Sequence, residues 1–95
     1  MTISQSGQVR AHLGDAPVTL RLSLAALMQI EQALEVSGLE ALSTRFRALS
    51  ASDLCEVLTA LLTAGGHEDA QALADAAPPA DAARAVLSCF EANLS

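Results

Sequence analysis

The chain has 95 residues, and its content of 52% hydrophobic residues is enough for one modest core and argues against wholesale disorder. The formal net charge is −6, with eleven acids against five arginines and no lysine, which argues against nucleic-acid binding because that affinity depends on neutralising phosphates. No apolar run approaches the roughly 20 residues that span a bilayer, and the polar start lacks the apolar segment of a signal peptide, so we expect a soluble protein that is not exported.

Residues 1–6 are polar, and we expect them to be disordered ahead of a single domain over residues 7–95. Two stretches in which apolar and polar residues alternate then flank residues 14–17, whose sequence Gly-Asp-Ala-Pro favours a turn. This pattern predicts a β-hairpin over residues 7–22 around a four-residue turn. Its apolar positions are Val9, Ala11, Leu13, Val18, Leu20 and Leu22. Since a lone hairpin is marginal in water, we expect this face to rest on other elements.

A helical period begins after Ser23, whose hydroxyl is suited to cap a helix, and Gly38 is suited to end it. The first predicted helix therefore covers residues 24–36. Its apolar arc consists of Leu24, Leu27, Met28, Ile30 and Leu34. A second helix is predicted over residues 39–48. Its apolar stripe consists of Leu39, Leu42, Phe46 and Leu49.

A third helix is predicted over residues 52–64, where two pairs of residues can form a capping box. Ser50 can pair with Asp53, or Ser52 can pair with Glu56, and we favour the second pair. The helix has the widest apolar arc of the chain, formed by Leu54, Val57, Leu58, Leu61 and Leu62, and it ends at Gly65-Gly66. This arc is either the centre of the core or, in part, an exposed surface that binds a partner.

Two further helices are predicted over residues 68–76 and 80–93, on either side of Pro78-Pro79. The first of them has acids in its first turn, where the helix dipole favours them. The last has an apolar stripe of Ala83, Val86, Leu87, Phe90 and Leu94. Because strands and helices do not alternate, the predicted fold class is α+β: an N-terminal β-hairpin followed by four or five short helices, mostly α.

Residues that carry chemistry are few. Neither His12 nor His67 has a histidine or cysteine partner at metal-ligand spacing, and we interpret residues 67–69, His-Glu-Asp, as a solvated helix start. Cys55 and Cys89 lie beside apolar stripes, which is typical of buried thiols. The sequence therefore predicts no enzyme, no catalytic residue, no metal site and no cofactor.

Glu31 is a charged residue inside the apolar arc of the first predicted helix. A carboxylate there is costly unless it is paired, so either it accepts bonds from backbone N–H groups or an arginine, or it anchors a partner at an exposed groove. The candidate arginines are Arg10, Arg21, Arg45 and Arg47. We favour the structural interpretation, under which Glu31→Ala destabilises the fold by about 1 to 3 kcal/mol.

The order of these pieces resembles the tail-assembly chaperones of gene transfer agents and tailed phages, small proteins encoded beside the major tail protein and sometimes labelled tail tube proteins. The pieces are Gly7-Gln8-Val9, Gly14 with Leu20-Arg21-Leu22, Leu27-Met28-Gln29-Ile30-Glu31, Leu61-Leu62-Thr63-Ala64-Gly65-Gly66 and Ala85-Val86-Leu87. They span roughly residues 7–92, and their order and spacing carry the resemblance.

The resemblance implies a protein of the bacterial cytoplasm, of phage or prophage origin, that binds the tape-measure protein, the tail tube protein or both during assembly. Under this hypothesis it covers amphipathic helices by helix-in-groove contact, and the partner-binding candidates are Glu31, Leu54, Val57, Leu58, Leu61 and Leu62. The alternatives are a structural component that stays in the tail and an adaptor unrelated to phages. The sequence leaves the oligomeric state open, although an exposed hairpin edge can pair with a second copy.

Overall fold

The computed structural model describes residues 8–94, and the prediction for residues 1–6 lies outside them. In chain order the elements are β1 (Gln8–Leu13), β2 (Ala16–Arg21), α1 (Leu24–Leu34), α2 (Leu39–Arg45), a turn of 3-10 helix η1 (Phe46–Ala48), α3 (Ala51–Ala64), α4 (Ala70–Ala76) and α5 (Pro79–Leu94). Within the described residues the fold is thus an antiparallel hairpin followed by five α-helices, which confirms the predicted α+β class.

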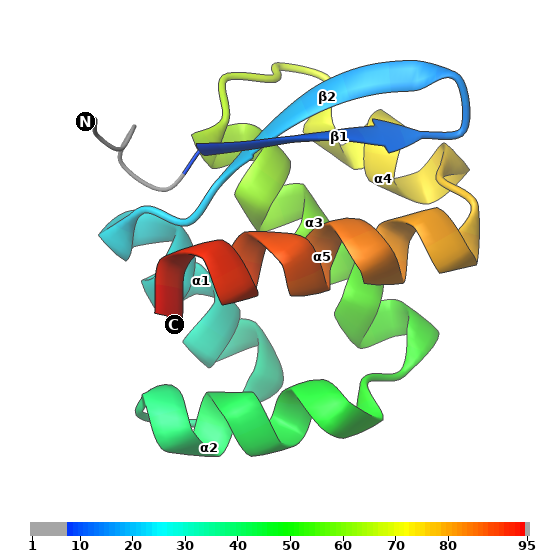
Figure 1. Ribbon diagram of the computed structural model, residues 1–95. Helices are drawn as coiled ribbons and strands as arrows, with labels where there is room; N and C mark the ends of the chain where they lie inside the picture. Colours follow the sequence, from blue (N-terminus) through cyan, green and yellow to red (C-terminus); the bar gives the residue numbers. More distant parts are fainter. Residues whose placement is uncertain (1–7, 95) are drawn as a thin grey trace.

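The hairpin lies across the helices, with β1 against α5 and β2 against α3 (Figure 1). α3 also packs against α1, α4 and α5, so it is the central helix of the fold. The hairpin places Leu13, Val18 and Leu20 in the core, as its alternation predicted. Among the described helices, none has the length and apolar character that crossing a membrane requires.

The hairpin closes more tightly than the sequence predicted. Strand pairing continues to Leu13 and Ala16, so the turn consists of Gly14 and Asp15 alone. Gly14 has a φ of +65°, which glycine adopts without strain at the first position of a two-residue hairpin turn. The predicted four-residue turn is wrong because Ala16 and Pro17 belong to β2, where an edge strand tolerates proline.

α1 begins as predicted and ends earlier. The hydroxyl of Ser23 accepts the N–H of Ala26 at 3.1 Å, which is the expected cap. At the other end Glu35 adopts a left-handed φ of 58°, and its N–H donates to the carbonyl of Gln32. Glu35 thus stops the helix three residues before Gly38, at a conformational cost that glycine would not pay.

The buried side of α1 is rotated from the predicted arc. Ala26, Ile30 and Leu34 are buried, whereas Leu24 is 73% exposed and Met28 is 55% exposed. Residues four apart on a helix share a face, so the buried three define its centre and the other two lie beyond its border. The predicted burial of Leu24 and Met28 is wrong because an apolar period does not by itself fix which part of a wide arc meets the core.

The segment between α1 and α3 also differs in detail from the prediction. The helix predicted over residues 39–48 becomes 3-10 at Phe46. The capping box of α3 uses Ser50, whose hydroxyl accepts the N–H of Asp53 at 3.1 Å. The favoured pair of Ser52 and Glu56 is wrong because its members are four residues apart, one more than the box requires.

The last two helices begin at different residues from those predicted. α4 begins at Ala70 and has no acid in its first turn, because Glu68 and Asp69 precede it. α5 begins at Pro79, which is tolerated there since the first N–H groups of a helix have no intrahelical partner. The buried residues of α5 are Ala82, Ala85, Val86, Cys89 and Phe90. Leu87, which the sequence assigned to this face, is 48% exposed.

Candidate functional site

Four of the five α3 residues that the sequence suggested for partner binding are fully buried. Val57, Leu58, Leu61 and Leu62 are 0% exposed, so they form the core and reach no surface in this structure. Leu54 is half-buried at the edge of the core, where it lines a surface cleft. Leu54 is therefore the member of this group that a partner can touch while α3 stays folded.

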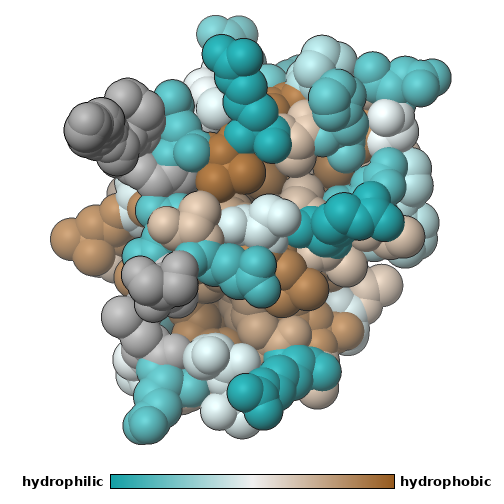
Figure 2. All heavy atoms as spheres, viewed as in Figure 1, coloured by the Kyte–Doolittle hydropathy of each residue, from teal (hydrophilic) through white to brown (hydrophobic). Residues whose placement is uncertain are grey.

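The cleft that Leu54 lines has a volume of about 200 Å³ and lies between η1, the start of α3 and α5. Its lining consists of Phe46, Arg47, Leu49, Leu54, Ala83, Val86 and Leu87. We refer to these seven residues as the apolar cleft. Leu87 stands at its border with 48% of its surface exposed. Figure 2 shows apolar side chains in the region between α5 and α2.

One wall of the apolar cleft is held by polar contacts at the corner between η1 and α3. Arg45 Nη2 lies 2.8 Å from Asp53 Oδ2, and Arg45 Nη1 donates to the carbonyl of Ala48 at 3.3 Å. The ring of Phe46 packs on that of Phe90, with centroids 4.1 Å apart. Since the ion pair is partly exposed, its stabilisation is modest, and its main effect is to fix the path of the chain into α3.

Glu31 lies at the border of the buried face of α1. Its Oε2 accepts the N–H of Gly38 at 2.9 Å, and Gly38 is the residue that precedes α2. A backbone N–H is one of the two kinds of partner that we expected for this carboxylate. This bond links the end of α1 to the start of α2. Because the bond is solvent-exposed, Glu31 is not a charge buried in the core.

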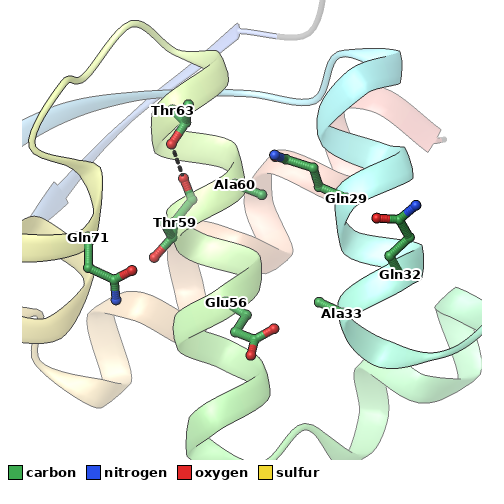
Figure 3. Close-up of a pocket in the computed structure, with 8 residues that line it drawn as sticks. All are labelled: Gln29, Gln32, Ala33, Glu56, Thr59, Ala60, Thr63 and Gln71. Atoms are coloured by element: carbon green, nitrogen blue, oxygen red, sulfur yellow. Dashed lines mark hydrogen bonds between the residues drawn. The ribbon is translucent and has the colours of Figure 1, made fainter.

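A polar trough of about 440 Å³ lies over α3 between α1 and α4 (Figure 3). Its lining consists of Gln29, Gln32, Ala33, Glu56, Thr59, Ala60, Thr63 and Gln71. The hydroxyls of Thr59 and Thr63 each donate at 2.8 Å to the carbonyl one turn earlier on α3. The trough offers amide and carboxylate groups for hydrogen bonding, and no large apolar side chain lines it, so it suits an apolar partner less well than the apolar cleft does.

Both cysteine environments favour the protonated thiol. Burial raises the pKa of Cys89 to about 11. The hydrogen bond from Cys55 Sγ to Asp75 Oδ1, 3.1 Å long, raises the pKa of Cys55, and burial adds to this effect. Because the thiolate is the nucleophile, neither setting favours covalent chemistry.

We had expected His67 to lie at a solvated helix start, and this prediction is wrong. Its Nε2 accepts the N–H of Thr19 at 3.0 Å in a half-buried setting, and α4 begins only at Ala70. The two residues are 48 positions apart, so no local sequence signal could have indicated this contact. Within residues 8–94, no three or more histidine, cysteine, aspartate or glutamate side chains are grouped to hold a metal ion.

Sequence reasoning missed the apolar cleft because its residues lie in three predicted core stripes. Phe46, Leu49 and Leu87 each continue an apolar period, which predicts burial. A signal was present in α5, where alanines at positions 82 and 85 start a second, overlapping stripe. Ala82 and Ala85 are buried, and Leu87 lies outside the face that they define.

A comparison with protein families gives one match that covers nearly the whole chain. The model of the family described as "Phage tail tube protein, GTA-gp10" matches residues 6–95. No curated protein and no solved structure matches the chain. The match agrees with the family that the order of the sequence pieces suggested.

Proposed function

This chain belongs to the phage tail tube protein, GTA-gp10, family and is a phage tail-related protein, and on that premise we propose that it is a tail-assembly chaperone of a phage-like particle or gene transfer agent. In this proposal it binds the tape-measure protein, the tail tube protein or both in the bacterial cytoplasm while the tail assembles. It acts by covering apolar surface on these partners and catalyses no reaction.

The apolar cleft is the observation that carries this proposal. A half-exposed leucine beside a preformed apolar hollow of about 200 Å³ suits the large side chains of an amphipathic helix. Such helices dock through apolar residues three or four positions apart, one of which would fill the hollow while the next covers Leu87. Exposed apolar surface with polar surroundings is a common mark of a protein-binding site.

The charge of the chain supports a partner with basic segments. A net charge of −6 attracts such segments at long range, which raises the rate of association more than the affinity. Arg47 lines the apolar cleft and is exposed, so it can meet an acid on the docked helix. Modest affinity is consistent with a chaperone that leaves its partner when the tube polymerises.

A pull-down with purified tape-measure and tail tube proteins tests the proposal. Leu87→Glu places a charge at the border of the apolar cleft and should abolish capture, while the fold stays intact because the side chain is already half-exposed. Leu24→Glu is the matched control, since it makes the same change at a leucine that is 73% exposed and is not part of the cleft lining. Capture of neither tail protein by the unmodified chain would refute the chaperone proposal.

The family description also favours a second function, a structural component that stays in the finished tail. Mass spectrometry of purified particles separates the two. A chaperone should be absent or far below the copy number of the tail tube protein, whereas a structural component should be present in a fixed ratio to it. An adaptor unrelated to phages, the third alternative, would be encoded away from tail genes.

A further inference from the structure

The two edges of the hairpin differ in how they are protected. Along the outer edge of β2, Pro17 has no N–H to offer, and the N–H of Thr19 is taken by Nε2 of His67. The carbonyl of Thr19 lies against Gly65, so closely that a Cβ on that glycine would overlap it. Proline, covering loops and occupied donors are the means by which proteins prevent a strand edge from pairing with another chain.

The outer edge of β1 has no such protection in the described part of the chain. Arg10 is paired with Thr19, whose N–H points away from β1, so the backbone groups of Arg10 also point outward. Two residues further on, those of His12 do the same. No hydrogen bond among residues 8–94 uses these outward groups.

A groove of about 420 Å³ runs along this open edge, between β1 and α5. It is lined by Arg10, Ala11, His12, Gly14, Asp81, Arg84, Ala85 and Ser88. The α5 members follow a spacing of three or four residues and so form one ridge of the helix. Figure 1 shows that β1 and α5 run side by side, so a strand added to β1 would lie over this ridge.

The charges around the groove differ from those of the chain as a whole. Arg10 and Arg84, two of the five arginines of a chain with net charge −6, line it together with His12. The one acid in the lining, Asp81, is already engaged: its carboxylate accepts the N–H of Gly14 at 2.8 Å and pairs with Arg84 at 3.0 Å. Arg10 forms no ion pair with any described residue.

These charges select between the possible occupants. A second copy that paired its own β1 antiparallel about Arg10 would set Arg10 opposite Arg10 of that copy, and like charges directly opposite are destabilising. A partner strand with acids at alternate positions would instead place its carboxylates beside the side chains of Arg10 and His12. Its intervening side chains would lie over Ala85 and Ser88, where small or polar groups fit.

We propose that the open edge of β1 binds an extended, acidic segment of a partner protein, which adds a third strand to the hairpin. The backbone groups of Arg10 and His12 form the hydrogen bonds that hold this strand, and Arg10 and Arg84 select for its acids. A three-stranded sheet is more stable than a lone hairpin, so binding also stabilises the N-terminal part of the fold. This site uses none of the residues of the apolar cleft and does not rest on the proposed function.

Two short synthetic peptides of equal length test the proposal, one that alternates glutamate with valine and one that alternates lysine with valine. Each is titrated into the full chain while amide hydrogen exchange is followed by NMR. The expected result is saturable binding of the glutamate peptide, with slowed exchange at the N–H groups of Arg10 and His12. The lysine peptide should bind at least about tenfold more weakly, because it sets cations against cations.

Arg10→Glu and Arg47→Glu make the same change of charge at exposed arginines on two different sites. The first should weaken binding of the glutamate peptide by about three- to tenfold, and the second should leave it unchanged. Equal affinity for the two peptides, no binding, or protection that appears outside β1 would overturn the proposal. A dimer in sedimentation that itself protects Arg10 and His12 would assign the edge to a second copy and overturn it as well.

Discussion

Gly65, at the end of α3, packs directly against the carbonyl group of Thr19 in β2. The φ of Gly65 is −78°, which any residue adopts, so glycine is required here by the close approach of two chain segments and not by backbone conformation. The contact brings the following residues alongside β2, where His67 bonds the N–H of the same threonine. The central helix is thereby fixed to the outer edge of the hairpin.

Gly65→Ala should be among the most destabilising single substitutions outside the core, by about 2 to 4 kcal/mol, because the added methyl group must displace the backbone of β2. Urea denaturation followed by circular dichroism measures the change. Gly38→Ala gives the comparison without a steric clash: no atom lies within 4 Å of its Cβ position, and its φ of +91° with a ψ of 152° alone should cost about 1 to 3 kcal/mol. A Gly65→Ala protein as stable as the unmodified chain would contradict the contact.

Glu35→Gly should stabilise the fold by about 0.5 to 1 kcal/mol, since Glu35 holds a left-handed conformation that glycine adopts without strain. The opposite sign is expected for Gln32→Gly, in the helical part of α1, which should destabilise by about 1 kcal/mol. Thermal unfolding of both variants gives the comparison. A loss of stability in Glu35→Gly would mean that the glutamate side chain contributes more than its backbone costs.

Glu31→Ala should destabilise the fold by about 0.5 to 1.5 kcal/mol, because it removes the acceptor for the N–H of Gly38 at a solvent-exposed site. This lies at the low end of the range that the sequence suggested, since water can replace the lost partner. Glu31→Gln keeps an acceptor and should retain most of the stability. An unchanged melting temperature in Glu31→Ala together with lost capture of tail proteins would instead make Glu31 a partner-binding residue.

The stability of the fold should depend on the ionisation of Asp81. The N–H of Gly14 keeps the pKa of Asp81 below its usual 3.8, with a smaller contribution from Arg84 and against the opposing effect of burial. The folded state therefore binds this proton less tightly than the unfolded state. The stabilisation is complete above about pH 5 and is lost as the pH falls through the lowered pKa.

Asp81→Asn should accordingly be less stable than the unmodified chain at pH 7, and the two melting temperatures should converge as the pH is lowered toward 3. Melting curves at a series of pH values measure this. Asp15→Asn, in the exposed hairpin turn, removes the same charge and controls for the net charge of the chain. A difference between Asp81→Asn and the unmodified chain that is constant with pH would show that the carboxylate charge has no part in the contact.

Local patterns were sufficient for the elements that one segment determines by itself. The alternation in β1 and β2 predicted their buried residues, and the broad arc of α3 identified the helix that became central, because period and amphipathicity are properties of a few neighbouring residues. The α1 helix shows the limit. Its period was correct, but Leu24 and Met28 proved exposed because the part of the arc that meets the core is set by α3, which lies in a different segment.

The candidate sites were harder to predict from the sequence than the helices and strands, because they depend on tertiary packing. The apolar cleft brings together Phe46, Leu54 and Leu87 from three elements, and each alone continues a stripe typical of a core. The protected edge of β2 rests on a bond between Thr19 and His67, whose residue types carry no signal that they would meet. The order of short pieces, in contrast, was enough to suggest the family, because it samples the whole chain at once.

Co-expression with the tape-measure protein tests most directly whether this chain acts by covering apolar surface on a tail protein. The quantity to measure is the fraction of tape-measure protein that stays soluble. Our account predicts that the unmodified chain raises this fraction, that Leu24→Glu does so equally, and that Leu87→Glu, at the border of the apolar cleft, does not. A soluble fraction that is the same with and without the chain would contradict the account.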